Sequence, residues 1–341
     1  MHRPANLAER TTLRVGGPAD AWIHAESDDE VVEAVRECDD LGAAVLLLGD
    51  GSNLVVADAG FPGTVVEIDS RGVSVSEGDG FVDLRIAAGE PWDGLVAHAV
   101  SEGWSGIEAL SGIPGRCGSA PVQNVGAYGQ EVAEVITSVD VLDRARGEIA
   151  TLDSAACGFG YRTSAFKEQP SRWVVLSVTL RLRSSDLGVA RYAELAKSLE
   201  VEVENQARIE DIRTAVLALR ARKGMVLDPL DHDTWSAGSF FTNPVVLSDS
   251  SAPAGCPRYP AVTGIKLSAA WLIEHSGIRR GYSIGAADGA AISTKHTLAL
   301  CNRGAASASD VMELARAVQR RVSDSFGIDL AIEPTLVGNP G

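Results

Sequence analysis

The sequence predicts a multidomain protein that contains both helices and strands, and three observations support this prediction. The chain has 341 residues. A chain of that length exceeds what a single hydrophobic core usually fills, so two or three domains are expected. Hydrophobic residues make up 45% of the chain, which is enough for buried cores and too much for a disordered protein. Segments with helical spacing of apolar residues alternate with short runs that are typical of strands.

The first 70 residues indicate a small unit with one helix and several strands. Ser27 and Glu30 form a capping-box pattern at the start of a helix over residues 27–42, and Gly42 is placed to end that helix. Strand-like runs follow over 44–48, 54–56 and 64–68.

Residues 71–222 indicate a second unit that contains antiparallel strands. Apolar and polar residues alternate over 71–88, as in a half-buried sheet. A helix is expected over 91–103, with Pro91 in its first turn and Gly103 past its end. Strands near 136–143 and 173–182 and a helix over 208–222 complete the unit.

The last third of the chain indicates a further domain. A stretch rich in Pro, Gly and Asp over 224–260 is typical of loops around an active site. Ser309 is expected to cap a helix over 309–326, and Gly327 is expected to end it. Another helix is predicted over 266–275 and a final strand over 329–337.

Composition excludes several classes of protein. The formal net charge is −16, so the surface does not favour nucleic acid or anionic lipid. No apolar run approaches the ~20 residues that span a bilayer, and the N-terminus does not resemble a signal peptide. The five cysteines are odd in number and scattered, which favours reduced thiols in the cytoplasm. The histidines are isolated, so no metal site is expected.

Two glycine-rich loops are the first candidates for a ligand site. Gly49-Asp50-Gly51-Ser52-Asn53 follows a strand-like run, and its backbone N–H groups could approach a pyrophosphate. It is not a Rossmann fingerprint, because Leu54 stands where the third glycine belongs and a strand follows. The loop alone is therefore either an anion site or an ordinary turn.

The second glycine-rich segment covers residues 112–129. It contains five glycines and almost no charge, and it is too apolar for a flexible linker. Backbone pressed against a flat, neutral ligand would explain this composition. The alternative is a glycine-rich crossing with a structural role only.

Seven runs of residues spread across nearly the whole chain form a recognisable set. They are Thr11-Thr12-Leu13-Arg14-Val15-Gly16-Gly17-Pro18-Ala19, Leu48-Gly49-Asp50-Gly51-Ser52-Asn53-Leu54, the segment 112–129, Phe159-Gly160-Tyr161-Arg162-Thr163-Ser164-Ala165-Phe166-Lys167, Gly238-Ser239-Phe240-Phe241-Thr242-Asn243-Pro244, Lys266-Leu267-Ser268-Ala269-Ala270-Trp271-Leu272-Ile273-Glu274 and Ile332-Glu333-Pro334. In their residues and in their order, these runs resemble the UDP-N-acetylenolpyruvoylglucosamine reductases, flavoenzymes that complete N-acetylmuramate in bacterial peptidoglycan synthesis.

The resemblance implies a fold of the α+β class, with a two-lobed FAD-binding domain of the vanillyl-alcohol-oxidase (PCMH) type and a smaller α/β substrate-binding domain. The expected lobes are residues 1–70 and 71–222, and the expected substrate domain is 223–328, with residues 329–341 packing back near the active site. It also implies a cytoplasmic monomer that uses NADPH as hydride donor and binds neither nucleic acid nor membrane. The run Arg191-Tyr192-Ala193-Glu194-Leu195 is similar to the tyrosine-bearing crossover of one subclass.

The resemblance also assigns roles to residues. In catalysis, Ser239 would donate a proton, Arg162 would bind the substrate carboxylate and Glu333 would hold the enolic form. Tyr161, Tyr192, Lys223, Asn243 and His275 would bind substrate or NADPH, with His275 standing where the family often has glutamine. Non-covalent FAD would be bound by Gly49, Asp50, Gly51, Ser52, Asn53, Leu54, Ser111, Gly112, Ile113, Pro114, Gly115, Gly118, Ala120, Gln123, Asn124, Gly126, Ala127 and Tyr128.

These residue types suit the reduction of an enol ether of pyruvate. Hydride delivery to the methylene carbon leaves negative charge that spreads into the carboxylate, so the site needs a cationic fork and an acid. A serine is a weak acid, and it can act here only in a site that excludes bulk water. One alternative is another flavoprotein oxidase or dehydrogenase of the same FAD fold. A second is a flavin- or nucleotide-binding protein without catalysis.

Overall fold

The computed structural model describes residues 6–340, which divide into two compact units. Unit 1 takes the chain up to Ala19, then Gly51–Pro62, then everything from Lys223 on; unit 2 takes Asp20–Asp50 and Gly63–Arg222. The break after Arg222 coincides with the one expected from the sequence. The first stretches of unit 1 were assigned by sequence to a separate first lobe, and that three-part division stays a prediction.

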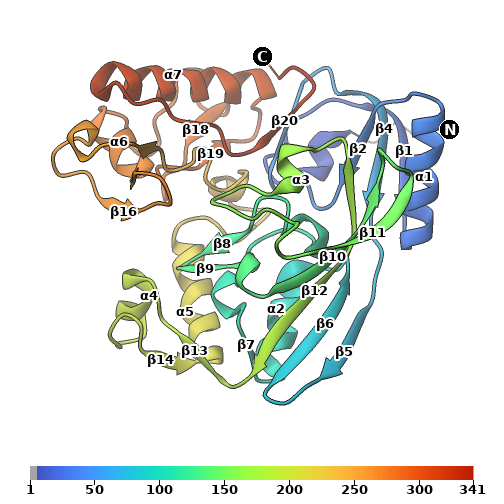
Figure 1. Ribbon diagram of the computed structural model, residues 1–341. Coiled ribbons are helices and arrows are strands. Elements are labelled where there is room, and N and C mark those ends of the chain that lie inside the picture. The colour runs from blue at the N-terminus through green and yellow to red at the C-terminus, as the bar shows by residue number, and fades with distance from the viewer. Residues whose placement is uncertain (1–5, 341) are drawn as a thin grey trace. The chain divides into compact units, whose positions relative to one another are not determined.

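An antiparallel six-stranded sheet forms the centre of unit 2 (Figure 1), with the order β11-β10-β12-β6-β5 and β7 paired with β12. The alternation predicted over 71–88 is the β5–β6 pair, in which Val75 lies opposite Leu84. One face of β6 is buried in the core beside α2, through the side chains of Val82, Leu84 and Ile86. The elements are β5 (Val73–Glu77), β6 (Phe81–Ala87), α2 (Trp92–Ser101), β7 (Trp104–Ser105), β10 (Ile136–Asp143), β11 (Glu148–Asp153) and β12 (Trp173–Ser184).

A second sheet of three strands, in the order β1-β4-β2, carries α1. Parallel pairing of β2 with β4 needs a crossover between the strands. The N-cap at Ser27 is confirmed, but the carboxylate of Glu30 accepts from the N–H of Glu26 at 2.7 Å instead of closing the predicted capping box. The elements are β1 (Ala19–Ala25), α1 (Asp28–Asp40), β2 (Val45–Leu48) and β4 (Phe61–Ile68).

Smaller elements complete unit 2. In the two main sheets, β1 and β11 have no counterpart in the sequence-based prediction, because their polar residues mask a strand pattern. The small elements are β8 (Gly126–Ala127), β9 (Gln130–Glu131), α3 (Ala165–Glu168), β13 (Leu187–Val189), α4 (Ala193–Ser198), β14 (Gln206–Arg208) and α5 (Ile209–Arg222).

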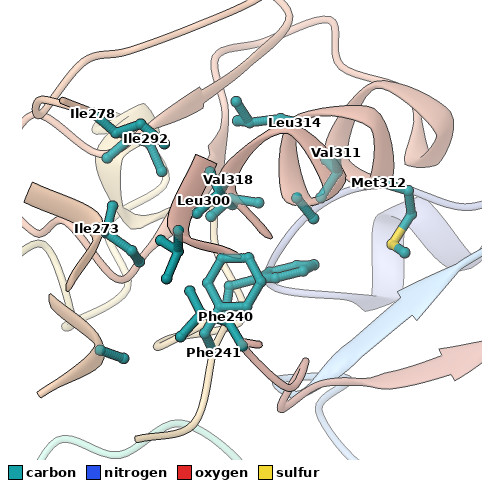
Figure 2. Close-up of a cluster of buried hydrophobic side chains, with 14 of the residues drawn as sticks. Phe240, Phe241, Ile273, Ile278, Ile292, Leu300, Val311, Met312, Leu314 and Val318 are labelled. Carbon is teal, nitrogen blue, oxygen red and sulfur yellow. The ribbon is translucent and has the colours of Figure 1, made fainter. Parts of the chain in front are cut away.

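Unit 1 is built around the long amphipathic helix α7, whose buried face packs with Phe240 and Phe241 (Figure 2). The strands of unit 1 are short and pair in separate groups: β3 with β20, β15-β17-β16, and β18 with β19. The elements are β3 (Leu54–Val56), β15 (Val245–Val246), β16 (Arg258–Pro260), β17 (Ile265–Leu267), α6 (Ala269–His275), β18 (Ala290–Ile292), β19 (Leu300–Asn302), α7 (Ala308–Phe326) and β20 (Thr335–Val337).

Two predicted helix starts in unit 1 are wrong. The cap of helix α7 lies two residues earlier than expected, at Ser307, because Ser307 and Asp310 form a capping box. Ser309 instead donates its hydroxyl to Asp58 at 2.7 Å. Residues 265–267 belong to β17, which pairs with strands on both sides, so α6 starts only after its cap Ser268.

Other features of the fold can be compared directly with the sequence-based predictions. Gly327 ends α7 in a left-handed conformation, as predicted. The expected final strand is regular only over Thr335–Val337, with an isolated bridge at Ile332. All five cysteines are buried free thiols. Within residues 6–340, no helix is both long and apolar enough to cross a bilayer.

Candidate active site

Ser239 lies in unit 1 between a glycine in a left-handed conformation and a firmly packed phenylalanine. Gly238 before it adopts a φ of +73°, and Phe240 after it has no solvent exposure. The ring of Phe240 meets that of Phe241 edge to face, with centroids 5.5 Å apart (Figure 2). The N–H of Phe240 donates to the carbonyl oxygen of Leu298 at 2.7 Å. The half-buried Ser239 is therefore held at the edge of a rigid core.

Glu333 reaches the same place from the C-terminal end of the chain. Its N–H donates to the carbonyl oxygen of Phe240 at 2.9 Å. Phe241 and Ile332 form an antiparallel bridge, and the N–H of Thr242 donates to Ala331 at 3.0 Å. The structure thus brings together two of the three predicted catalytic residues, on neighbouring extended segments of unit 1.

Arg162 lies in unit 2, and its position depends on the second glycine-rich segment. Its Nη2 donates to the carbonyl oxygen of Gly126 at 2.7 Å, and its Nη1 donates to that of Asn124 at 3.4 Å. Its φ of +54° is rare for a residue with a side chain and indicates backbone strain at this position. The side chain of Tyr161, 38% exposed, lies beside the guanidinium.

The two glycine-rich loops meet within unit 2 through one ion pair. Arg116 Nε lies 2.5 Å from the carboxylate of Asp50, and Arg116 Nη1 lies 3.1 Å from that of Asp69. By resemblance, both loops were expected to bind the flavin. Sequence reasoning treated the two loops separately, and it did not identify Arg116 as the contact that joins them.

Close packing explains some of the glycines by a structural cause. A Cβ on Gly118 would lie 2.5 Å from the Cβ of Ala88. One on Gly51, whose φ is +58°, would lie 2.2 Å from the carbonyl oxygen of Arg10. Contacts within the protein already require glycine at these positions, so glycine density alone does not identify a ligand site.

The chemistry of the donor set nevertheless fits a flavin. Arg116 is the one charged side chain of residues 112–128, and it is paired with carboxylates. Backbone and neutral side chains make up the rest, which suits a flat ring. The side-chain amide of Asn124 is already engaged within the protein, because it bonds Glu131, Gly160 and the N–H of Ala133.

The tyrosine-bearing segment contacts this part of unit 2. The rings of Tyr192 and Tyr128 meet edge to face, with centroids 5.7 Å apart. Arg191 donates to the carbonyl oxygen of Gly129 at 3.3 Å and pairs with Glu134. Burial raises the pKa of Tyr128 to about 12. Tyr192, 41% exposed, is therefore positioned next to a residue predicted to bind FAD.

The other predicted substrate residues lie in unit 1 and are partly engaged elsewhere. The Oδ1 of Asn243 accepts from the N–H of Ala269 at 2.9 Å, at the first turn of α6. His275 is exposed at the end of α6, where its ring stacks on Trp271 and its Nδ1 lies 2.8 Å from that residue's carbonyl oxygen. Lys223 follows α5 directly and is half-buried.

Sequence reasoning missed two charged residues that contact the second glycine-rich segment. Asp93 accepts from the N–H of Gly112 at 2.6 Å and from both Nη atoms of Arg213 at 2.6 and 3.0 Å. Arg220 is 9% exposed, and its Nε would lie 3.5 Å from a Cβ on Gly112. Neither Asp93 nor Arg220 belongs to a recognisable sequence motif. The one available signal was the helical spacing of Arg213 and Arg220 on α5. Among the described residues, no group of three His, Cys, Asp or Glu side chains could hold a metal ion.

Comparison with known proteins identifies the class first. Residues 19–153 match the family described as FAD binding domain. The chain is thus an FAD-dependent oxidoreductase, in agreement with the predicted cofactor and fold class. Residues 228–337 match the family described as UDP-N-acetylenolpyruvoylglucosamine reductase, C-terminal domain.

The chain belongs to the UDP-N-acetylenolpyruvoylglucosamine reductase family. It is 53% identical to the reductase of Salinispora arenicola, over 97% of this chain and 94% of that one, and 49% identical to that of Thermobifida fusca, over 98% of both. The solved reductase from Thermus caldophilus is 29% identical, covers 98% of both chains and superposes with a TM-score of 0.66. These findings confirm the resemblance and the predicted fold class, and they exclude the alternatives outside this family.

Proposed function

We propose that this protein reduces UDP-N-acetylglucosamine enolpyruvate to UDP-N-acetylmuramate, with NADPH as the electron donor, in peptidoglycan precursor synthesis. The reaction follows ping-pong kinetics. FAD held by the two glycine-rich loops would supply the hydride-transfer chemistry between NADPH and the enolpyruvyl group. Family membership supports the substrate class and the cofactor.

The chain's own residues provide the charge stabilisation and the proton. After hydride arrives, negative charge develops on the carbon next to the methylene carbon and spreads into the carboxylate. Arg162 binds this carboxylate with a planar, permanently charged fork. Glu333 holds the enolic form, and the Oγ–H of Ser239 protonates the carbon. The serine oxygen then takes a proton from water, which restores the protonated hydroxyl for the next turnover.

The observation that carries this assignment is the hydrogen bond from the N–H of Glu333 to the carbonyl oxygen of Phe240. It explains how residues almost a hundred positions apart can act on one carbon atom. Of the substrate residues, we propose that Tyr192, Lys223 and Asn243 contact the UDP moiety or the NADPH phosphates. Tyr161 and His275 are proposed to bind substrate. The eighteen loop residues named above are proposed to bind FAD.

An anaerobic two-step titration tests the proposal. Purified protein should be yellow, NADPH should bleach it, and the enolpyruvyl substrate should restore the colour. Failure of NADPH to bleach the protein would disprove the donor assignment, and failure of the substrate to restore the colour would disprove the acceptor assignment. We also expect a cytoplasmic location, with which the five buried free thiols are consistent. We expect a monomer, which gel filtration would test.

A further inference from the structure

Thr12 lies between the predicted pyrophosphate loop and the segment that carries Ser239. It is 6% exposed and belongs to unit 1, as do Gly51, Ser52 and Ser236. Its N–H donates to the carbonyl oxygen of Gly51 at 3.3 Å. Its hydroxyl lies 2.7 Å from the carbonyl oxygen of Ser236 and 3.3 Å from that of Ser52. A hydroxyl has a single proton to donate, so the short contact to Ser236 is the main bond.

Ser236 in turn is fixed relative to Ser239. Its own hydroxyl accepts from the N–H of Gly238 at 3.3 Å, and its backbone forms a bridge with Cys301. Between Ser236 and the anchored Phe240, the chain bends through Gly238 with a positive φ. The position of Ser239 is therefore set by Phe240 on one side and by the Ser236 carbonyl on the other.

The pyrophosphate loop is also connected to the Glu333 segment. The N–H of Thr335 donates to the carbonyl oxygen of Asn53 at 2.9 Å, and β20 runs parallel to β3 with Thr335 opposite Leu54. Residues 51–54 therefore contact one catalytic segment through Thr12 and the other through Thr335. Thr12 supplies the one side-chain hydroxyl in these two connections, so it can be tested by substitution.

We propose that Thr12 is a positioning residue whose hydroxyl couples FAD occupancy of the Gly49–Leu54 loop to the placement of Ser239. This inference rests on the proposed function, because it assumes that the loop binds FAD and that Ser239 protonates the substrate. A ligand that orders the loop also orders the Ser236 carbonyl through Thr12, and the acid then meets the substrate in the correct position. Hydride transfer from NADPH does not use Ser239, so Thr12 acts on the second half of the reaction.

Thr12→Val removes the hydroxyl and keeps the branched shape, and Thr11→Val is its matched control. Thr11 is equally buried at 6%, but its hydroxyl donates locally to Val15 at 3.2 Å. Thr12→Val should slow anaerobic reoxidation by the enolpyruvyl substrate by about tenfold, the usual scale for one buried hydrogen bond. Bleaching by NADPH should stay near the wild-type rate, and Thr11→Val should be near wild type in both steps.

Hydrogen–deuterium exchange over residues 236–241 gives a readout independent of turnover. In the wild type and in Thr11→Val, removal of FAD should speed exchange of this segment. In Thr12→Val with FAD bound, exchange should already be fast and should respond much less to removal of FAD. Thr12→Ser, which keeps the hydroxyl, should restore the wild-type response.

The outcomes separate this inference from the proposed function. If wild-type protein is bleached and reoxidised but Thr12→Val behaves like Thr11→Val, the inference is wrong and the function stands. Equal loss of both half-reactions in Thr12→Val would also contradict it, because Thr12 would then only support FAD binding. If neither Thr12→Val nor Thr12→Ala folds, the hydroxyl is a requirement of folding and the inference fails. A wild type that NADPH cannot bleach refutes the proposed function itself.

Discussion

The backbone N–H of Glu333 donates to the carbonyl oxygen of Phe240 at 2.9 Å, and this bond joins the two segments of unit 1 that carry the proposed catalytic residues. Ser239 precedes Phe240, so the proposed acid and the carboxylate residue Glu333 lie on neighbouring extended segments. The core under Phe240 and Phe241 keeps both segments in place. The chemistry of the proposed reaction can be tested residue by residue from this arrangement.

Ser239→Ala removes the proposed proton donor without disturbing the packed phenylalanines. The variant should still be yellow and should still be bleached by NADPH, because that step needs no acid. Turnover should fall by about 10²–10⁴, the usual scale for general acid catalysis. Stopped-flow absorbance of each half-reaction measures both steps. Loss of bleaching in this variant would indicate a flavin or folding defect and remove Ser239 as the acid.

Arg162→Lys keeps a positive charge but removes the planar fork. The strain of a positive φ is unchanged, because lysine has the same Cβ. The KM for the enolpyruvyl substrate should rise by about 10- to 100-fold, the scale of hydrogen bonds to a charged group. Arg181→Lys is the control, since Arg181 makes an equally bidentate but exposed pair with Asp83. Such a pair contributes little, so an equal effect in both variants would argue against the assignment.

Gly51→Ala tests whether the first loop depends on close packing. The new Cβ would lie 2.2 Å from the carbonyl oxygen of Arg10, in addition to the strain of a φ of +58°. Gly42→Ala is the matched control, because Gly42 has a φ of +64° and no atom within 4 Å of its Cβ. The control should lose about 1–2 kcal/mol of folding free energy from the left-handed backbone alone. Gly51→Ala should lose more folding free energy than the control, which denaturant melts will measure. It should also purify with less FAD, which the ratio of flavin to protein absorbance will measure.

Protonation of Asp93 at low pH should weaken the retention of FAD. Burial by itself raises the pKa of Asp93, but hydrogen bonds from Arg213 and from the N–H of Gly112 outweigh it and lower the pKa below its ordinary value. A lowered folded-state pKa contributes stability that is present above the unfolded value, about 4, and is lost as the pH falls through the folded value. Wild-type protein should therefore release flavin on acidification below about pH 4.

Asp93→Asn tests this dependence at neutral and acid pH. At neutral pH it should raise the FAD dissociation constant by about tenfold, since one charged partner of Gly112 is gone. Below about pH 4 its remaining FAD should show a weaker acid dependence than the wild type. Flavin fluorescence on release measures both effects. Asp83→Asn is the control, because the pKa of Asp83 is likewise lowered, by Arg181, at an exposed position. An identical acid profile in wild type and Asp93→Asn would contradict the prediction.

The sequence by itself determined the local features and the family. Capping residues and periodicity predicted α1, α2 and α5 and the stop at Gly327, because these depend on neighbours within one or two turns. It also identified both glycine-rich loops and, through the family resemblance, named Ser239, Arg162 and Glu333. Seven short runs in one order were sufficient for that, since each motif is local in the chain.

Only the tertiary structure decided which local features meet. Ser309 appeared to be a cap, but Asp58, some 250 positions away, binds its hydroxyl, and Ser307 caps the helix instead. Lys266 pairs with two strands and is not helical. Three contacts join segments that are distant in the sequence. They are the ion pair of Arg116 with Asp50, the hydrogen bond from Gly112 to Asp93, and the contacts of the Thr12 hydroxyl with Ser52 and Ser236. No pattern in the sequence encodes such contacts, because hydrogen bonds and ion pairs depend on distance in space, which the packed cores set.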